Sequence, residues 1–91
     1  MKYQVKLTGR FRKEYKRAVK RGLHIELLDE IITQLAQGKP LDAVHRDHAL
    51  IGNYAHHREC HIQPDWLLVY RIEEDILTLT LTRTGTHSDL F

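Results

Sequence analysis

The sequence predicts an α+β fold of order β-α-α-β-β-β, with two N-terminal helices packed on one face of a mostly antiparallel sheet. Apolar residues recur at helical spacing over two stretches of the N-terminal half. Strand-like patterns fill most of the chain after residue 55, and a charged turn separates the last two of them. Placing both helices on one side of the sheet buries both apolar stripes and leaves the other face of the sheet partly open.

The N-terminal half predicts one strand followed by two helices. Residues 3–7 alternate apolar and polar, which is the pattern of a half-buried strand. Thr8 can then cap a helix that ends at Gly22. A second helix is expected over residues 24–37, because leucines and isoleucines form an apolar stripe there, and the Gly-Lys-Pro segment 38–40 ends it.

The C-terminal half predicts a loop and then three strands. Residues 41–52 are expected to form the loop, and residues 55–62 the first strand. Residues 66–72 are apolar on both faces, as in a central strand. The acidic segment 73–75 makes a hairpin turn, and residues 76–83 alternate leucine with threonine, which is typical of a strand with one face in the core.

The composition indicates one small globular domain over residues 1–91. The chain is 42% hydrophobic and 29% charged, which argues against disorder. No apolar run approaches the roughly 20 residues that span a bilayer, and the N-terminus lacks the apolar segment of a signal peptide. Cys60 is the only cysteine, which fits a reducing compartment. We therefore expect no membrane contact and a cytoplasmic location.

Positive charge is concentrated at the N-terminus. Nine of the 14 lysines and arginines lie within the first 21 residues, where only Glu14 opposes them. Such a stretch suits contact with nucleic-acid phosphates, because each lysine or arginine there releases condensed counterions. A solvated, lysine-rich helix face is the alternative interpretation. The residues expected to contact RNA are Lys13, Lys16, Arg17 and Lys20.

Histidines are concentrated in the centre of the chain. Five of the seven lie between residues 45 and 61. Strand alternation puts His57 and His61 on one face of the predicted strand and Cys60 on the opposite face. Because Cys60 is the better core residue, His61 should face outward. Alternation also separates the ligands of a zinc site built from these three residues, and no paired Cys-x-x-Cys is present, so we predict no metal.

The predicted hairpin brings polar residues to one end of the sheet. Asp65 and Trp66 lie at the start of one strand of the hairpin, whereas Arg83 ends the other strand and His87 follows it, so these residues should lie together. Alternation nevertheless puts Arg83 on the core face with the leucines of its strand. A bulge or the end of the strand must therefore turn its side chain away from the core. His61 joins the group across the turn after residue 62.

These residue types are complete for cleaving RNA without a metal. RNA carries its own nucleophile, the 2′-OH, so a base, an acid and a cation suffice. Histidine suits the first two, because its ordinary pKa of about 6.5 allows both protonation states near neutrality, and arginine suits the phosphate. Each residue could instead have a purely structural role: a histidine could be an exposed loop residue, the tryptophan a core residue, and the aspartate a turn former. The set of interest is His48, His61, Asp65, Trp66, Arg83, His87 and Phe91.

Three segments resemble the YafQ toxins of the RelE/ParE superfamily. They are Asp47-His48-Ala49-Leu50-Ile51-Gly52, the run from Arg58 to Tyr70 with its His-Ile-Gln-Pro-Asp-Trp core, and Arg83-Thr84-Gly85-Thr86-His87-Ser88-Asp89-Leu90-Phe91. The resemblance covers residues 47–91, and the N-terminal half agrees in length, helix pattern and charge. It implies a RelE-like fold and an endoribonuclease that cuts mRNA on the ribosome. Because the residue types listed above suffice for the reaction, we expect no cofactor.

The same resemblance implies roles and partners. His87 would act as general acid or base, with His48 and Asp65 as partners in proton transfer. His61 would orient or stabilise, and Arg83 would bind the scissile phosphate. Trp66 and Phe91 would contact the base. The basic first helix would anchor the toxin on ribosomal RNA. A DinJ-like, DNA-binding antitoxin would neutralise it, and operator DNA would be bound only through that complex.

Two other functions compete with this one. A ParE-like toxin would inhibit DNA gyrase by binding and would cut no RNA. A simple RNA- or DNA-binding module would depend on the basic helix alone. The three histidines His48, His61 and His87 favour the nuclease, because a pure binding surface has no need of several proton carriers.

Overall fold

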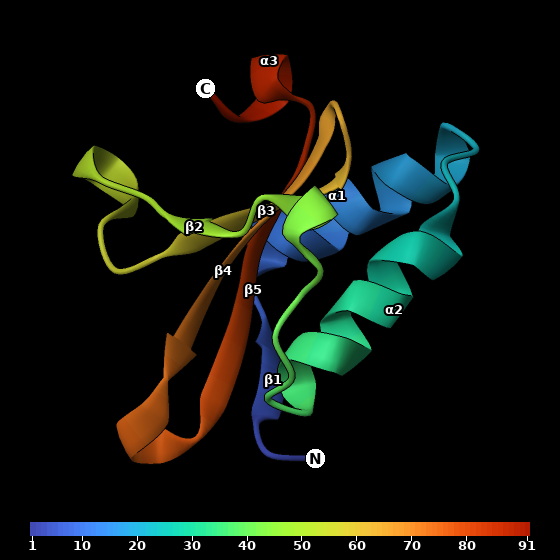
Figure 1. The fold of residues 1–91 in the computed structure, drawn as a ribbon. Coiled ribbons are helices and arrows are strands. Elements are labelled where there is room, and N and C mark those ends of the chain that lie inside the picture. Colours follow the sequence, from blue (N-terminus) through green and yellow to red (C-terminus); the bar gives the residue numbers. More distant parts are fainter.

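The computed structural model describes residues 1–91 and has a five-stranded sheet with two helices on one face (Figure 1). The strands are β1 (Gln4–Leu7), β2 (His48–Ala49), β3 (Arg58–Gln63), β4 (Trp66–Glu73) and β5 (Thr78–Gly85). The helices are α1 (Gly9–Lys20), α2 (Ile25–Ala36) and the short α3 (His87–Leu90). Single turns of 3-10 helix lie in the connections: η1 (Ala43–His45), η2 (Gly52–Tyr54) and η3 (Glu74–Ile76).

The sheet order is β1-β5-β4-β3-β2, and only the β1–β5 pair is parallel. This confirms the predicted α+β fold and its mostly antiparallel sheet. The prediction missed β2, which lies inside the segment expected to be a loop and pairs with β3. A strand of two residues is too short for alternation to reveal it. Strand β3 also starts at Arg58, three residues later than predicted, because the preceding residues form a turn.

Helix α1 begins and ends as the sequence predicts. The Thr8 hydroxyl accepts a hydrogen bond from the Phe11 backbone N–H at 2.9 Å and caps the helix. The same hydroxyl donates to the Thr82 carbonyl on β5 at 2.8 Å, so the cap also attaches α1 to the sheet. Gly22 after the helix has φ of 75°, a left-handed conformation that favours glycine.

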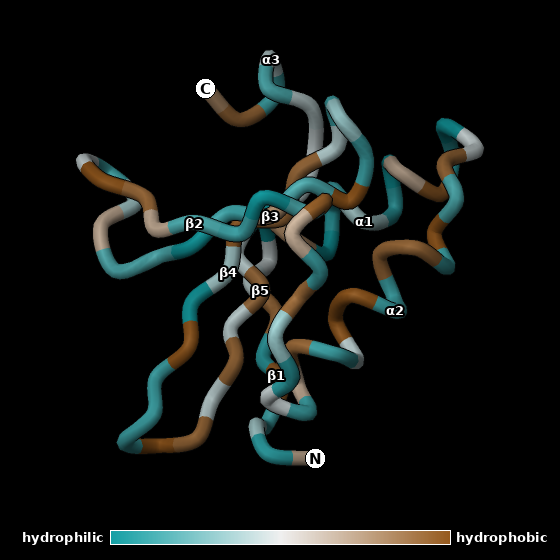
Figure 2. Tube along the Cα trace, in the orientation of Figure 1, coloured by the Kyte–Doolittle hydropathy of each residue, from teal (hydrophilic) through white to brown (hydrophobic).

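The core lies between the helices and the sheet. Fourteen buried residues form it, among them Phe11, Leu28, Tyr70 and Leu81. Figure 2 shows hydrophobic stretches along α2 and along the long strands, with polar residues over most of the turns. The opposite face of the sheet carries a much smaller cluster centred on Leu67, Val69 and Leu90, and is otherwise uncovered by helices. No helix has the length and apolar character needed to cross a membrane.

A bulge in β5 explains why Arg83 does not face the core with the leucines of its strand. The register of the β4–β5 pair shifts so that Tyr70 pairs with Leu81 but Val69 pairs with Arg83, which leaves Thr82 as the extra residue. Arg83 therefore leaves the core face and joins Val69 on the uncovered face. Strand β5 begins at Thr78, whereas the predicted strand began at residue 76. Leu77 has φ of 47° and is 48% exposed, so it lies before the strand and outside the core.

Candidate active site

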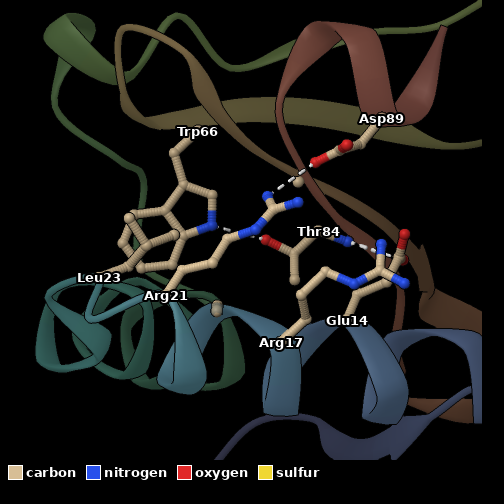
Figure 3. Close-up of a pocket in the computed structure, with 9 residues that line it drawn as sticks. Glu14, Arg17, Arg21, Leu23, Trp66, Thr84 and Asp89 are labelled. Carbon is tan, nitrogen blue, oxygen red and sulfur yellow. Dashed lines mark hydrogen bonds and ion pairs between the residues drawn. The ribbon is translucent and has the colours of Figure 1, made fainter.

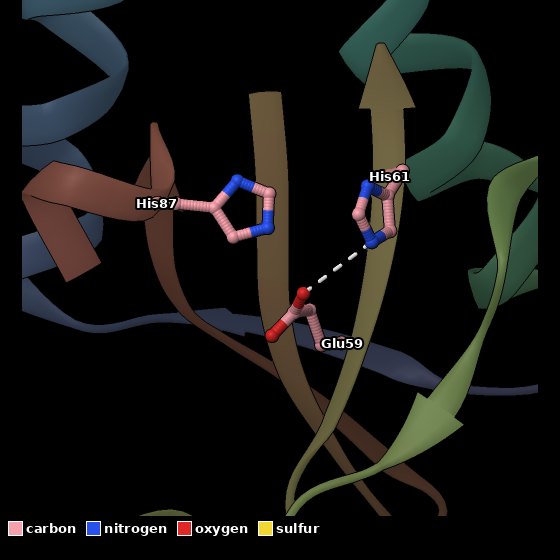
Figure 4. Close-up of side chains that lie close together, drawn as sticks. All are labelled: Glu59, His61 and His87. Carbon is pink, nitrogen blue, oxygen red and sulfur yellow. Dashed lines mark ion pairs between the residues drawn. The ribbon is translucent and has the colours of Figure 1, made fainter. Parts of the chain in front are cut away.

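Three histidines from separate parts of the chain meet on the uncovered face of the sheet. His48 on β2 lies directly opposite Glu59 on β3, so their side chains share this face. The ring centroids of His48 and His61 are 6.4 Å apart, and those of His61 and His87 are 5.6 Å apart. Figure 4 shows His61 and Glu59 on β3 with His87 reaching toward them from the C-terminal segment. The sheet therefore brings together side chains that lie up to 39 residues apart in sequence, from His48 to His87.

Asp65 holds the ring of His87. One carboxylate oxygen accepts hydrogen bonds from the His87 backbone N–H at 3.0 Å and from its Nδ1 at 2.7 Å. The backbone bond from His87, followed by the ring bond, lowers the pKa of the Asp65 carboxyl below its ordinary value. Because a carboxylate only accepts, Nδ1 carries a proton, and in the neutral ring Nε2 has the free lone pair.

His48 and His61 are oriented in the same way through Nδ1. The His48 Nδ1 donates to the Arg46 carbonyl at 2.6 Å, and the His61 Nδ1 faces the Pro64 carbonyl at 3.3 Å. Backbone carbonyls only accept, so in both rings Nδ1 is again the donor. All three neutral imidazoles therefore present Nε2 as an acceptor. This is the tautomer that a general base requires.

Glu59 completes the cluster, and sequence reasoning gave it no role. Its side chain is 7% exposed, and its carboxylate lies 3.6 Å from the His61 Nε2, forming an ion pair when that ring is protonated. Because Glu59 lies two residues before His61 on the same strand, alternation puts both on one face, and this is the one signal in the sequence that could have found it. Donor atoms of Glu59, His61 and His87 lie within 4.8 Å of one another, so this set could also hold a metal ion.

Cys60 does not belong to this group of possible ligands. It lies in the core on the opposite face of β3, as alternation predicted, and is fully buried. Burial raises the pKa of the Cys60 thiol to about 12, which leaves it protonated and unreactive.

Arg83 lies beside the cluster and is held by three elements. Its Nε and Nη2 donate to the Glu14 carboxylate on α1, at 3.3 and 2.7 Å. Its Nη2 also donates to the Asp89 carbonyl of α3, and its Nη1 to the Tyr54 hydroxyl at 3.2 Å. Hydrogen bonds to Glu14 are the main reason that the pKa of Arg83 rises further above its ordinary high value. Arg83 is thus a permanent cation that ties the site to α1.

Trp66 does not reach the open site. It is 3% exposed, packs in the core on the helix side, and donates from Nε1 to the Thr84 hydroxyl at 3.0 Å. Figure 3 shows it beside Leu23 and next to Thr84, in the narrow space between α1 and the end of β5. The expectation that Trp66 contacts a base is therefore not supported, because its indole ring is covered by side chains.

Phe91 is exposed at the end of the chain, beside Tyr54. Its side chain is 63% exposed, and its ring meets that of Tyr54 edge-on with 5.9 Å between centroids. Tyr54 was not singled out from the sequence, since it lies in a segment without strand or helix periodicity. Its two contacts join Phe91 to the guanidinium of Arg83.

The four basic residues expected to contact RNA are all exposed but do not share one surface. Lys13 and Arg17 border a hollow that also includes Arg10 and, from β5, Arg83. Lys16 lies on another side of α1, next to a groove beside Phe11. Lys20 is exposed at the end of the helix. The basic surface nearest the histidine cluster is thus the one that contains Lys13 and Arg17.

The fold and the site together define a small α+β protein with an acid–base site on the uncovered face of its sheet. The family model for YafQ, described as a bacterial toxin of type II toxin–antitoxin systems, matches residues 3–91. The mRNA interferase toxin YafQ of Escherichia coli (strain K12) is 36% identical over 88 residues, covering 96% of this chain and 94% of that protein. The chain belongs to the YafQ toxin family.

Solved structures of relatives have the same fold. The crystal structure of YafQ from Escherichia coli has a TM-score of 0.92 and 34% identity, with 98% of each chain covered. A metal-bound toxin from Helicobacter pylori has a TM-score of 0.92 and 40% identity, covering 98% of this chain and 99% of that one. YafQ in the Escherichia coli DinJ–YafQ complex has a TM-score of 0.91 and 36% identity, with 98% of each chain covered.

Proposed function

We propose that this chain is an endoribonuclease that cuts mRNA on the ribosome by acid–base chemistry. The observation that carries the proposal is the convergence of His48, His61 and His87 with the carboxylate of Asp65. The relative named an mRNA interferase is similar over nearly the whole chain, which supports the same activity here. The cytoplasm, where ribosomes translate mRNA, is the location that this function requires.

The reaction needs two proton transfers and no metal. A neutral imidazole removes the proton of the 2′-OH, the 2′ oxygen attacks the adjacent phosphorus, and the bond to the departing 5′ oxygen breaks. A protonated imidazole gives its proton to that 5′ oxygen, and a 2′,3′-cyclic phosphate remains. His87 suits one of these transfers, because Asp65 fixes its ring with Nε2 free. His48 suits the other, since its Nε2 is free as well.

The remaining residues stabilise charge and bind RNA. His61, paired with Glu59, supplies a second cation near the phosphate when it is protonated. Arg83 keeps its proposed phosphate contact through Nη1, whose one partner is the neutral hydroxyl of Tyr54. Phe91 offers an exposed ring on which a base can stack. Lys13, Lys16, Arg17 and Lys20 would anchor α1 on ribosomal RNA.

A DinJ-like antitoxin is the proposed partner. The DinJ–YafQ complex of a relative supports a cognate antitoxin for this chain. An acidic segment of that antitoxin would complement the exposed cations of α1. Binding to operator DNA would then belong to the complex, through the antitoxin.

The alternative of a gyrase inhibitor that acts by binding alone receives less support. Its surface would not need three imidazoles held through Nδ1, two of them with Nε2 free, nor a carboxylate that orients one of them. The same argument applies to a simple nucleic-acid-binding module, for which the cations of α1 would be enough.

Mapping mRNA ends after induction tests the proposal. Wild type is compared with His87→Ala and with His24→Ala, a control in which an exposed histidine without a side-chain cap bond is removed. We expect new mRNA ends with wild type and with the control. With His87→Ala their number should fall at least about 100-fold, because general acid–base catalysis contributes a factor of this size or larger. Equal thermal midpoints would show that His87→Ala is folded. Undiminished cleavage by His87→Ala would contradict the proposal.

A further inference from the structure

A hollow of about 400 Å³ lies beside the histidine cluster, and His61 forms part of its wall. It is formed by η1 and the residue after it, together with the end of β3 and the following turn. Small-ligand sites occupy roughly 300–1,000 Å³, so this hollow is large enough for a ligand. None of the steps of mRNA cleavage described above uses it.

The walls of the hollow contain two backbone irregularities. Arg46 has φ of 47°, a left-handed conformation that is unfavourable for a residue with a Cβ atom. On the facing wall, the β3–β4 register shifts between His61 and Gln63, which turns Gln63 out of the regular alternation. Irregularities of both kinds are enriched beside functional sites.

These walls are tied directly to the histidine cluster. The His45 ring nitrogen Nδ1 donates to the His61 carbonyl at 2.7 Å, so η1 is fixed against β3. The left-handed turn at Arg46 directs its carbonyl to the Nδ1 of His48. The same short segment therefore shapes the hollow and orients one of the histidines proposed to transfer a proton.

The lining offers the three kinds of contact that a nucleotide makes. Arg46 is an exposed cation suited to a phosphate oxygen. The exposed amide of Gln63 can both donate and accept, as the hydrogen-bonding edge of a base requires. Val44 is 72% exposed and provides an apolar surface for the face of the base.

We propose that this hollow binds the mRNA nucleotide adjacent to the scissile bond, and so sets the sequence preference of cleavage. The inference rests on the proposed ribonuclease function. Single-stranded RNA is the ligand class, because its unpaired bases can enter such a hollow and present their edges to side chains. His61 belongs both to the cluster and to the wall, so a strand that crosses the cluster passes directly into the hollow.

The test compares cleavage rates on ribosomes programmed with four mRNAs that differ only in the nucleotide flanking the cut. Gln63→Met keeps the length of the side chain and removes its hydrogen bonds. Val44→Trp fills the hollow, and Ile51→Trp places the same ring at a 91% exposed position outside it. Arg46→Asn removes the cation at a position where asparagine tolerates the left-handed conformation, with Arg71→Gln as the charge-matched control on β4.

We expect Gln63→Met to change the ratio between the best and worst mRNA about fivefold, the effect of one hydrogen bond. Val44→Trp should reduce cleavage of all four mRNAs at least about tenfold, whereas Ile51→Trp and Arg71→Gln should leave both rate and ratio unchanged. Arg46→Asn should slow all four mRNAs alike. Wild-type ratios and rates in Gln63→Met, Val44→Trp and Arg46→Asn would overturn the assignment of the hollow. Absence of cleavage by the wild-type protein would instead overturn the ribonuclease function, and this assignment with it.

Discussion

The carboxylate of Glu14 on α1 and the guanidinium of Arg83 on β5 form a buried ion pair, with 2.7 Å between Oε2 and Nη2. The side chain of Arg83 is 10% exposed and that of Glu14 is 8% exposed. Glu14 also accepts a hydrogen bond from the Thr84 backbone N–H, which lies past the end of β1 and has no strand partner on that side. The pair therefore closes the open edge of β5 and holds Arg83 next to the histidine cluster.

Breaking this pair should destabilise the protein strongly. Arg83→Ala leaves Glu14 buried without its cation, and the expected loss in the free energy of unfolding is about 3–5 kcal/mol. Glu14→Ala should have a similar effect, whereas the double variant that combines Glu14→Ala with Arg83→Ala should lose less than the sum of the two single changes. Urea denaturation measures all three. Strictly additive losses would contradict a coupled pair.

Arg83 has two roles that a single substitution would remove together, one in stability and one proposed in cleavage. Loss of cleavage in Arg83→Ala would combine the loss of the proposed phosphate contact with a loosened structure. Glu14→Gln is the control, because it weakens the pair and keeps the guanidinium. Cleavage that survives in Glu14→Gln and fails in Arg83→Ala would assign the effect to the guanidinium itself.

The contact between Asp65 and His87 should depend on pH only in acid. The folded state lowers the pKa of Asp65, so the contact stabilises the protein above the carboxyl's unfolded pKa and is lost as pH falls through the lower, folded value. Near neutrality the carboxylate stays ionised and His87 stays oriented. An NMR titration of the Asp65 carboxyl carbon measures this pKa, and a midpoint at or above its ordinary value would contradict the structure.

Asp65→Asn should separate orientation from stability. An amide can place either its oxygen or its nitrogen toward Nδ1, so the tautomer of His87 is no longer fixed. We expect the cleavage rate to fall at least about tenfold, with little change in thermal midpoint because Asp65 is exposed. A fall in midpoint that alone accounts for the lost activity would show that Asp65 acts only through folding.

Trp66 and Phe91 should behave in opposite ways on truncation. Trp66→Ala removes a buried ring and its bond to Thr84, and should reduce the free energy of unfolding by about 3–5 kcal/mol. Phe91→Ala removes an exposed ring and should lower cleavage with little effect on stability. Thermal unfolding and cleavage assays on both variants check this. A stable Trp66→Ala with normal folding but no RNA binding would restore the base-contacting role first expected for it.

Zinc ions should inhibit cleavage. The imidazoles of His61 and His87 and the Glu59 carboxylate lie close enough to bind one ion with a fourth position left to solvent. A ring nitrogen bound to zinc cannot transfer a proton, so the cleavage rate should fall as zinc is added and return when a chelator removes it. Magnesium, which prefers oxygen ligands, is the control. Faster cleavage with zinc would contradict the metal-independent mechanism.

Local patterns were enough to predict most of the fold and part of the site. Alternation along β3 correctly put Cys60 in the core and His61 on the other face. The hairpin correctly placed Asp65 near His87, because a tight turn and a strand pairing determine that distance. The parity conflict at Arg83 correctly indicated an irregularity at the end of this strand, and of the two explanations left open, a bulge or the end of the strand, the structure shows the bulge.

The features that escaped prediction depend on contacts between distant residues. Glu14 and Arg83 are 69 residues apart, and nothing near either residue indicates the other. A tryptophan such as Trp66 suits a base-stacking position on the surface as well as a position in the core. Only the packing of α1 and its neighbours over the ring shows that Trp66 is a core residue. Tyr54 and Glu59 gain their places from the tertiary arrangement, without a motif of their own.

The parallel pairing of β1 with β5 has a consequence for the order of folding. Gln4 pairs with Thr78, so this contact closes nearly the whole chain into a loop and is entropically expensive to form early. The β4–β5 hairpin is local and can form first. Strand β1 and the Thr8 end of α1 then have a template to attach to, so we expect this N-terminal segment to dock last and to detach first when the protein unfolds.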